Sequence, residues 1–248
     1  MSSTRAAGCP PRERSPSAAG SAQVARWLGL LGGERLTGPV AVLSPHLDDA
    51  ALSLGAAIAA AKGDVRVVTV LAGDPAADHP AGEWDAGAGF RTAGEAARVR
   101  RAEDELACRD LGARPLWLPF NDHQYPRGGD DETIWARLED ALGGAETVLV
   151  PGHPLMHPDH AWLAELVRAR GLPGRRVGRY VEQPYASAWS HTSGDWAVLG
   201  AAASHRLTKL RACRRYRTQL PLMAPEARSL WRLTRYEAAR GGECVRWT

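Results

Sequence analysis

A histidine and two adjacent aspartates follow a β-prone run in the first quarter of the chain. The segment VAVLSPHLDDAALSLG, residues 40–55, places His46, Asp48 and Asp49 where a buried strand is expected to end. Neighbouring carboxylates repel each other, so such a cluster is costly unless a cation lies among its members. Residues three apart on a turning backbone can converge, so His46 and Asp49 could hold one divalent ion and leave Asp48 free beside it.

A second cluster, HPDH at residues 157–160, could supply the missing ligand. It offers two histidines three residues apart, where a helix is expected to begin. Two imidazoles and one carboxylate suit zinc, and a catalytic zinc site keeps an open position for water. Asp48 could then take the proton of the attacking water, while the spare histidine stabilises the oxyanion or protonates the leaving amine. These parts fit the hydrolysis of an amide.

Each cluster also has an ordinary explanation. Asp48 and Asp49 could be the N-cap and a first-turn acid of the following helix, and His157 and His160 could be polar loop residues. Because both clusters follow expected strands of one sheet, we favour the metal site. The other histidines are more isolated and are treated as non-ligands, His153 being the nearest to an exception: His79, His123, His153, His191 and His205.

Short β-branched runs alternate with amphipathic segments along most of the chain. Strands are expected over residues 39–44, 64–73, 115–120, 146–151 and 176–184, and helices over 48–63, 92–113, 132–145, 160–170 and 205–220, with a last helical stretch around Trp231 and Tyr236. The alternation predicts an α/β fold with a Rossmann-like, mostly parallel sheet flanked by helices. Ligands of such sheets bind beyond the carboxyl ends of the strands, so the two clusters could face one crevice.

The composition is that of a globular protein. Of the 248 residues, 44% are hydrophobic and 24% are charged, and a net charge of +3 is too small to indicate a nucleic-acid partner. Residues 1–22 are rich in Ser, Ala, Gly, Pro and Arg and predict a disordered leader before a single domain over 23–248, which ends in an irregular helical tail. The four scattered cysteines indicate reduced thiols. No apolar run is long enough for a membrane span and no signal peptide is recognisable, so we expect a cytoplasmic protein.

Taken together, the motifs resemble those of a known family. PHLDDA followed by HPDH resembles the P-H-x-D-D and H-x-x-H hallmarks of the PIG-L/LmbE family of zinc-dependent N-deacetylases. RRAEDELACRDLGA is similar to the family's R-x-x-E-x-x-x-A-x-x-x-L-G helix, and KLRACRRYRTQ to its tail pattern K-x-x-A-x-x-x-Y-x-x-Q. The matching positions are Arg100, Glu103, Ala107, Leu111, Gly112, Lys209, Ala212, Tyr216 and Gln219. The likeness runs from about residue 38 to 220, and the paired motifs in this order are specific.

The resemblance implies a role for each residue of the two clusters. His46, Asp49 and His160 would bind the zinc ion, Asp48 would be the general base, and His157 would be the acid or the oxyanion stabiliser. Family members remove an acetyl group from N-acetylglucosaminyl compounds, which include phosphatidylinositol, mycothiol and bacillithiol precursors and sugar-bearing antibiotics. A second branch cleaves thiol conjugates.

The resemblance also points to substrate-binding residues. Asp122 in the loop LPFNDHQY and Arg100 in the long helix would contact the substrate. The loop 74–91, where the family reads its substrate, carries Trp84 and Phe90, which could stack on a sugar or simply pin the loop.

Two positions depart from the commonest family pattern. Leu47 stands where Pro is usual, and Ala50 stands where Glu is usual. Neither position is a ligand in the family, so metal binding should stand. The loss of the Glu could remove a hydrogen bond that orients a ligand.

The sequence therefore predicts a hydrolase that removes an N-acetyl or other N-acyl group from an amino-sugar-containing small molecule. One Zn²⁺ per chain is expected, and Fe²⁺ could replace it at a site with two histidines and one aspartate. The alternatives are a metal-dependent hydrolase of another bond, such as a thiol-conjugate amide or a phosphoester, and an inactive sugar-binding relative. Abundant Ala, Arg and Gly suggest a GC-rich bacterial genome and a secondary-metabolite or thiol-cofactor pathway. A homo-oligomer is compatible with the sequence.

Overall fold

The sheet of this protein carries the site at its centre. In the computed structural model, which describes residues 18–75, 78–189 and 195–248, seven strands are ordered β3-β2-β1-β4-β5-β7-β6. The strands are β1 (Val40–Ser44), β2 (Val65–Thr69), β3 (Arg114–Trp117), β4 (Thr147–His153), β5 (Arg176–Val181), β6 (Ala197–Val198) and β7 (Cys244–Trp247). The first five are parallel, and β7 is antiparallel to both β5 and β6. The prediction of a mostly parallel α/β sheet is confirmed.

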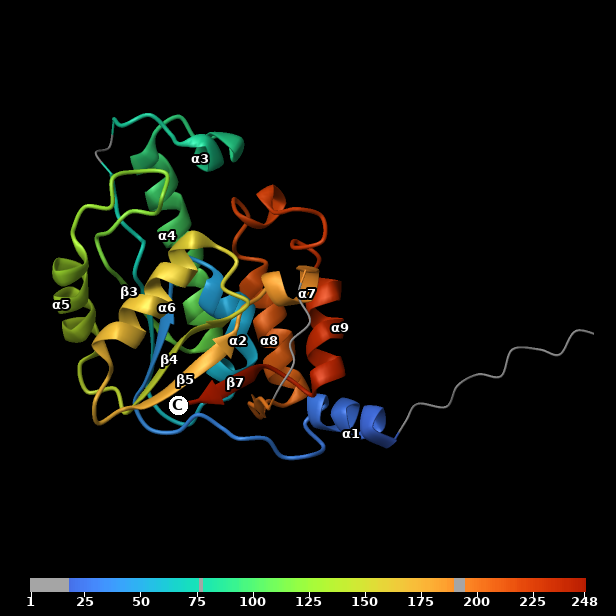
Figure 1. Cartoon of the computed structure of the whole chain (residues 1–248). Helices are drawn as coiled ribbons and strands as arrows, with labels where there is room; N and C mark the ends of the chain where they lie inside the picture. Colours follow the sequence, from blue (N-terminus) through green and yellow to red (C-terminus); the bar gives the residue numbers. More distant parts are fainter. Residues whose placement is uncertain (1–17, 76–77, 190–194) are drawn as a thin grey trace, which may run out of the picture.

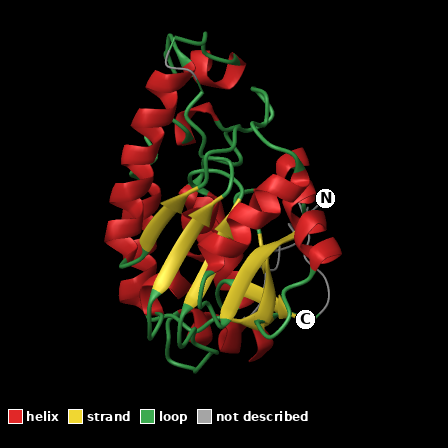
Figure 2. Cartoon of the chain, turned by 90° about the vertical axis from the view of Figure 1, so that its left-hand side faces the viewer, coloured by secondary structure: helices red, strands yellow, loops and turns green. Residues whose placement is uncertain are grey.

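Helices cover both faces of this sheet (Figures 1 and 2). They are α1 (Ala18–Trp27), α2 (Asp49–Ala60), α3 (Glu83–Gly87), α4 (Ala93–Leu111), α5 (Asp131–Leu142), α6 (Pro158–Arg170), α7 (Tyr185–Trp189), α8 (Ala203–Cys213) and α9 (Leu230–Arg240), with a short 3₁₀ helix η1 (Leu220–Leu222). Val40 and Val42 pack with residues of α2 and α4, whereas Ala41 and Leu43 pack with residues of α5 and α6. Strand β1 is therefore buried on both sides, as central parallel strands are.

The strand order reverses between β1 and β4. The chain runs from β1 outward through β2 to β3, and then returns to pair β4 with the other side of β1. Such a reversal opens a crevice beyond the carboxyl ends of the two strands, where ligands of α/β sheets bind. The segments 44–49 and 152–160 follow β1 and β4, so the fold brings both candidate clusters to this crevice.

Most element boundaries differ from the expectations by a few residues. Helix α4 begins after the N-cap Thr92 and ends before Gly112, which has a left-handed φ of 72°, as expected. Helix α2 instead ends at Ala60, before Gly63, and α6 begins at Pro158 because His157 is its N-cap.

The largest corrections lie near the two ends of the chain. The expected helix over 205–220 stops at Cys213, because the backbone N–H groups of Arg217 and Thr218 donate to Glu103 instead of continuing the helix. The four residues of β7 add an unexpected antiparallel strand at the end of the chain. Residues 1–17 of the expected leader lie outside the described part of the chain, and residues 18–22 belong to α1, which packs against α9.

Other expectations concern membranes and cysteines. Among the described helices, none is long and apolar enough to cross a membrane. Cys108, Cys213 and Cys244 are buried and unpaired, as expected of reduced thiols, while Cys9 lies outside the described residues.

A buried lysine joins the tail to the central helix. Lys209 of α8 is almost fully buried and lies 2.5 Å from Glu237 and 2.6 Å from Glu243. Glu243 also accepts hydrogen bonds from the backbone N–H groups of Ala56 and Ala57 in α2. Gly55 makes room for this arrangement, because a Cβ there would lie 2.8 Å from Cγ of Lys209. Lys209, which belongs to the tail pattern, therefore helps to hold the tail against α2.

We expect Lys209→Met to destabilise the fold by about 3–5 kcal/mol, because it leaves two carboxylates buried without their cation. The chain offers one matched control, since Lys62 is its other lysine and is exposed. Urea denaturation of both variants measures the effect. A loss below about 1 kcal/mol for Lys209→Met would show that the buried ion pairs contribute little.

Candidate metal centre and pocket

Three donor atoms from two distant segments converge beyond the ends of β1 and β4. Nε2 of His160 lies 3.2 Å from Nδ1 of His46 and 3.2 Å from Oδ2 of Asp49, and the latter two atoms are 3.4 Å apart. Zinc bonds of about 2.0–2.1 Å place tetrahedral ligands about 3.3–3.4 Å from one another. The separations therefore match one triangular face of a tetrahedral zinc site. The predicted convergence of His46 and Asp49 with one histidine of the second cluster is thus present in the structure.

The loop after β1 is shaped by its own hydrogen bonds. Ser44 Oγ donates to the carbonyl of His46 and accepts from the N–H of Ala50, and the N–H of His46 donates to Oδ2 of Asp49. These bonds fold the turn so that His46 and Asp49 face the same point. Ala50, where the family usually has Glu, is buried in this turn.

Two carboxylates that sequence reasoning missed hold the imidazoles in place. Asp159 Oδ2 lies 3.0 Å from Nε2 of His46, and Glu182 Oε1 lies 2.5 Å from Nδ1 of His160. Carboxylates on the far nitrogen fix the tautomer and ring orientation of metal-binding histidines. Since both rings have such a partner, their orientation does not depend on a carboxylate at position 50.

Asp159 and Glu182 are themselves anchored. Arg127 lies 2.6 Å from Oδ1 of Asp159, and Glu182 accepts the N–H of Leu155 at 2.7 Å. Burial alone would raise the pKa of Asp159, but the hydrogen bond and charge of His46 together with Arg127 hold it well below its usual value. Asp159 could have been suspected from its place inside HPDH, whereas Glu182 carries no local signal beyond its position at the end of an expected strand.

His157 lines the pocket and is the N-cap residue of α6. Its Nδ1 accepts the N–H of Asp159 at 3.2 Å, so a neutral ring carries its proton on Nε2. Its ring centroid lies 4.8 Å from that of His46 and 5.1 Å from that of His160. Burial and the charges of these two neighbours lower the pKa of His157 to about 4, so the ring is neutral at pH 7.

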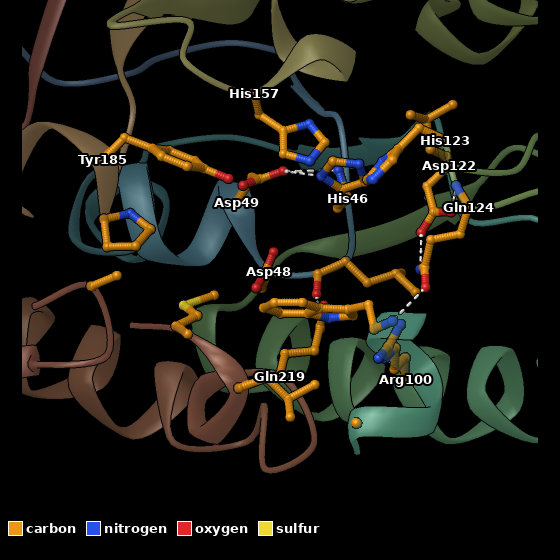
Figure 3. A pocket seen from close by; sticks show the side chains of 18 of the residues that line it. His46, Asp48, Asp49, Arg100, Asp122, His123, Gln124, His157, Tyr185 and Gln219 are labelled. Atoms are coloured by element: carbon orange, nitrogen blue, oxygen red, sulfur yellow. Dashed lines mark hydrogen bonds and ion pairs between the residues drawn. The ribbon is translucent and has the colours of Figure 1, made fainter. Parts of the chain in front are cut away.

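Asp48 projects into the pocket that His46 and Asp49 also line (Figure 3). It occupies the N-cap position of α2, but its side chain makes no capping hydrogen bond, so helix capping does not account for it. Burial and the adjacent charge of Asp49 raise the pKa of Asp48 well above its ordinary value. A carboxylate with a raised pKa can accept and return a proton near neutral pH.

The charges around the donors fit a cation. Asp48, Asp49, Asp159 and Glu182 are all buried around two imidazoles. Burial alone would lower the pKa values of both histidines. Hydrogen bonds to Asp159 and Asp49 and the charge of Asp49 instead raise the pKa of His46 to about 9. Hydrogen bonds to Asp49 and Glu182 and their charges raise the pKa of His160 to about 10. The cluster therefore draws positive charge to itself, which is what a site for a divalent ion requires.

A second combination of nitrogen ligands is close in space. Donor atoms of His46, His157 and His160 also lie within 4.8 Å of one another. The ring of His157 is held by its cap to α6, however, whereas Oδ2 of Asp49 lies 3.4 Å from Nδ1 of His46 and 3.2 Å from Nε2 of His160. Asp49 therefore suits the third ligand position better.

His123 is less isolated than the sequence suggested. It lines the pocket, with its Nδ1 3.3 Å from Oδ2 of Asp159, and it forms a further possible ligand group with His157 and Asp159. It comes from the loop after β3, which the sheet order places near β1. The structure places His79, His153 and His205 outside these ligand groups, and His191 lies outside the described residues.

The candidate substrate residues line one pocket of about 820 Å³ together with His46 and Asp49, whereas the third donor, His160, is fully buried and is not part of the pocket lining. Arg100 is buried and pairs with Asp85, while its Nε and Nη2 have no hydrogen-bond partner among the described residues. Asp122 accepts two hydrogen bonds from Gln124, which also lines the pocket. Trp84 lines it too, whereas Phe90 lies beside the guanidinium of Arg100.

The tail pattern positions the loop that carries the site. Gln219 donates its side-chain amide to the carbonyl of Leu47, between His46 and Asp48. The preceding turn is fixed because Glu103 of α4 accepts from the N–H groups of Arg217 and Thr218, each at 3.0 Å. Tyr216 donates to Asp104 of the same helix at 2.8 Å. Glu103, Tyr216 and Gln219 are therefore far from His46 in the sequence, but their hydrogen bonds help to hold the loop that carries His46 and Asp48.

The Rossmann-like sheet and this His/Asp donor group together define a metal-dependent enzyme with its site at the switch point. The family comparison is specific: the sequence model of the PIG-L family, GlcNAc-PI de-N-acetylase, matches residues 41–170, just over half of the chain. The chain belongs to the PIG-L family, and its class is that of the metal-dependent N-deacetylases. None of the curated proteins matches it.

Several solved structures share the fold. The A40926 pseudoaglycone deacetylase Dbv21 is 27% identical with a TM-score of 0.71, covering 84% of this chain and 95% of that one. The N,N'-diacetylchitobiose deacetylase of Pyrococcus horikoshii is 18% identical with a TM-score of 0.56, covering 96% and 94%. The 4-carboxy-2-hydroxymuconate hydratase GalB of Pseudomonas putida is 20% identical with a TM-score of 0.62, covering 85% and 96%. A hydratase shares this architecture, so the fold alone does not define the reaction.

Proposed function

We propose that the protein uses one Zn²⁺ to hydrolyse the N-acetyl group, or another N-acyl group, of an amino-sugar-containing small molecule. The observation that carries the proposal is the triangle of His46, Asp49 and His160 donor atoms, 3.2–3.4 Å apart, with Asp48 beside it. The family match and the deacetylase activities named for the A40926 and chitobiose enzymes support the reaction. Fe²⁺ is an alternative ion for the same donor set.

Each residue then has a defined task. Zinc, when bound, supplies a positive charge that polarises the amide carbonyl and lowers the pKa of water. Asp48 takes a proton from the attacking water as the carbon–oxygen bond forms. It returns that proton to the nitrogen as the carbon–nitrogen bond breaks, so that acetate and a free amine leave.

The structure favours one of the two roles considered for His157. Its lowered pKa and its cap to α6 leave a neutral ring with the proton on Nε2. Such a ring donates a hydrogen bond to the developing oxyanion more readily than it transfers a whole proton. Arg100 and Asp122 line the same pocket and offer polar groups to the sugar.

The pathway, the cellular location, the oligomeric state and the identity of the acyl group are predictions. Teicoplanin and A40926 deacetylases among the structural neighbours support a role in secondary metabolism. A cytoplasmic location, a homo-oligomer and the acetyl group as the acyl unit are further predictions of the same kind.

An amine-release assay tests the proposed reaction. Zinc-loaded protein is incubated with a panel of N-acetylglucosaminides, and the free amine is quantified with fluorescamine. Release that depends on zinc and on Asp48 is the expected result. Metal-loaded protein that releases no amine from any member of the panel would overturn the proposal.

Glu182→Gln should lower the affinity for zinc by about 10- to 100-fold, because the uncharged amide no longer raises the basicity of His160. Competition with a fluorescent chelator measures the affinity. Glu165→Gln serves as the control, since Glu165 is exposed on α6 and pairs only with Arg168 among the contacts of the described residues. Equal zinc affinities of the two variants would show that Glu182 does not support zinc binding through His160.

Zinc affinity should rise with pH between about 6 and 9. The metal-free histidines have pKa values raised to about 9 and about 10, so they are protonated at neutral pH and must lose these protons when they bind the ion. Proton release is measured by titration calorimetry at pH 7 in buffers of different ionisation enthalpy. Binding without proton release would show that the imidazoles are not the ligands.

A further inference from the structure

A tyrosine of the pocket has no task in the reaction proposed above. Tyr185, the first residue of α7, lines the pocket together with His46, Asp48 and Asp49. Its side chain is half-buried, yet its hydroxyl forms no hydrogen bond with any of the described residues. A phenol has an ordinary pKa of about 10, so at neutral pH its O–H is a hydrogen-bond donor. The pocket therefore contains a donor whose acceptor must come from outside the protein.

The ring of Tyr185 packs against one of the metal donors. Its centroid lies 5.3 Å from that of His160, and the two rings meet edge to face at an interplanar angle of 84°. Figure 3 shows the hydroxyl end of Tyr185 pointing toward Asp49, another member of the donor triangle. Burial and the nearby carboxylates of Asp49 and Asp48 raise the pKa of Tyr185 well above its ordinary value, which agrees with this placement. The hydroxyl thus faces the place where the reaction would occur.

The residues just before α7 fix the position of Tyr185 relative to the metal donors. Glu182, three residues earlier in the chain, lies 2.5 Å from Nδ1 of His160. The backbone N–H of Gln183 donates to Oγ of Ser53 in α2, the helix that begins at Asp49. One short segment therefore supports His160, is tied to α2 and presents the phenol. It lies beyond residues 41–170, the part that the family model matches.

Amide hydrolysis creates an acceptor that the free protein does not contain. As the oxygen of water adds to the carbonyl carbon, the carbonyl oxygen becomes an oxyanion, and its charge disappears when the carbon–nitrogen bond breaks. Donors that already point at this oxygen stabilise the transition state without reorganising. His157 offers its Nε2–H from the start of α6, and Tyr185 offers its O–H from the start of α7. Two donors from separate elements can therefore serve one oxyanion.

From this arrangement we infer that Tyr185 is a further catalytic residue, which donates a hydrogen bond from its hydroxyl to the oxyanion of the amide under attack. The inference rests on the proposed function and adds a second donor beside His157. Tyr185 keeps its proton throughout, because Asp48 carries the proton from water to the leaving nitrogen. Since the hydrogen bond forms with a charge that develops only during the reaction, its loss should lower kcat and leave KM unchanged.

A single-atom change tests the inference. Tyr185→Phe removes the hydroxyl and keeps the ring beside His160, so kcat for amine release from the N-acetylglucosaminides should fall by about 10²-fold at unchanged KM and zinc affinity. Tyr236→Phe is the matched control, because Tyr236 lies on α9 outside the pocket lining, and it should keep the parent kcat. An unchanged kcat for Tyr185→Phe would overturn the inference. A loss of activity that follows weaker zinc binding would also overturn it, because Tyr185 would then act by supporting Asp49.

A binding measurement with a stable anion separates this inference from the proposed reaction. Methylphosphonate, a tetrahedral anion that imitates the attacked acetyl group, is titrated into the zinc-loaded parent and both variants by calorimetry. Tyr185→Phe should raise its Kd by about 10- to 100-fold, which corresponds to one hydrogen bond to a charged group, and Tyr236→Phe should leave it unchanged. This result would support the donor even if no acetylated compound released amine, an outcome that would overturn the deacetylase proposal alone.

Two results of the same titration would contradict the role of Tyr185. One is an equal Kd for the parent and Tyr185→Phe, and the other is a zinc-loaded parent that does not bind methylphosphonate. Either result would overturn the inference and leave the deacetylase proposal to be decided by the amine-release assay.

Discussion

Asp48→Asn is expected to reduce kcat for amine release by about 10²- to 10⁴-fold while the protein keeps its zinc, the range found when a general base is removed. The substitution preserves the size of the side chain and removes its ability to accept a proton. Because Asp48 neither caps α2 nor belongs to the donor triangle, neither folding nor metal binding should depend on its charge. Kinetics with metal-loaded protein, together with metal content by mass spectrometry, give both quantities.

The control for this variant is Asp64→Asn. Asp64 is an exposed carboxylate that pairs with Arg114 at the opposite end of β2, so its loss should leave the rate and the metal content unchanged. An Asp48→Asn protein that retained the parent rate would show that another group takes the proton. A variant that lost zinc would instead place Asp48 among the ligands.

Replacing His160 by Ala should weaken zinc binding by about 10²- to 10³-fold, since binding free energies of roughly 10–16 kcal/mol are shared among about four ligands. His46→Ala should have a similar effect. The activity of both variants should fall with their metal content and recover in part when zinc is added in excess. Metal analysis after dialysis and chelator competition measure the loss.

His79→Ala is the appropriate comparison for these two variants. His79 is exposed and lies on the loop before α3, with its Nδ1 close to the carbonyl of Pro80. It should retain zinc in full. Retention of one zinc by His160→Ala at parental affinity would mean that His46 binds the ion with other partners, for which His157 is a candidate.

The sequence was sufficient to predict the fold class and the meeting of the two clusters. Hydrophobic strands alternating with helices define a parallel sheet, and a parallel sheet gathers the residues after its strands at one edge. That rule alone brings His46 and Asp49 near His160, although 111 to 114 residues separate them in the chain. The family resemblance supplied the choice of His160 over His157 as the ligand, and in the structure Nε2 of His160 lies 3.2 Å from Nδ1 of His46 and from Oδ2 of Asp49.

The supporting residues could not be predicted in the same way. Glu182 follows β5 and lies 2.5 Å from His160, and the β4–β5 pairing shifts register between Pro151 and His153, details that no local pattern reveals. Glu103 and Lys209 were noticed as pattern residues, but their partners in a turn and in a buried ion pair depend on tertiary packing. Strand β7 has only four residues and carries too weak a periodicity to be recognised.

The apolar residues that line the pocket illustrate the same limit. Trp84 could be singled out because it lies in a loop rich in Gly, Pro and Asp, where an aromatic residue stands out. Trp189, Leu222 and Met223 come from segments that look unremarkable in sequence, and only the packing of α7 and η1 beside the site brings them together. These pocket-lining residues therefore lie outside the motifs that identify the family.

An anomalous-diffraction map of a zinc-loaded crystal is the most direct measurement of the central claim. The account predicts one strong peak per chain, bonded at about 2.0–2.2 Å to Nδ1 of His46, a carboxylate oxygen of Asp49 and Nε2 of His160. A peak bonded to a different set of side chains, or no peak at the ends of β1 and β4 in fully loaded protein, would contradict it.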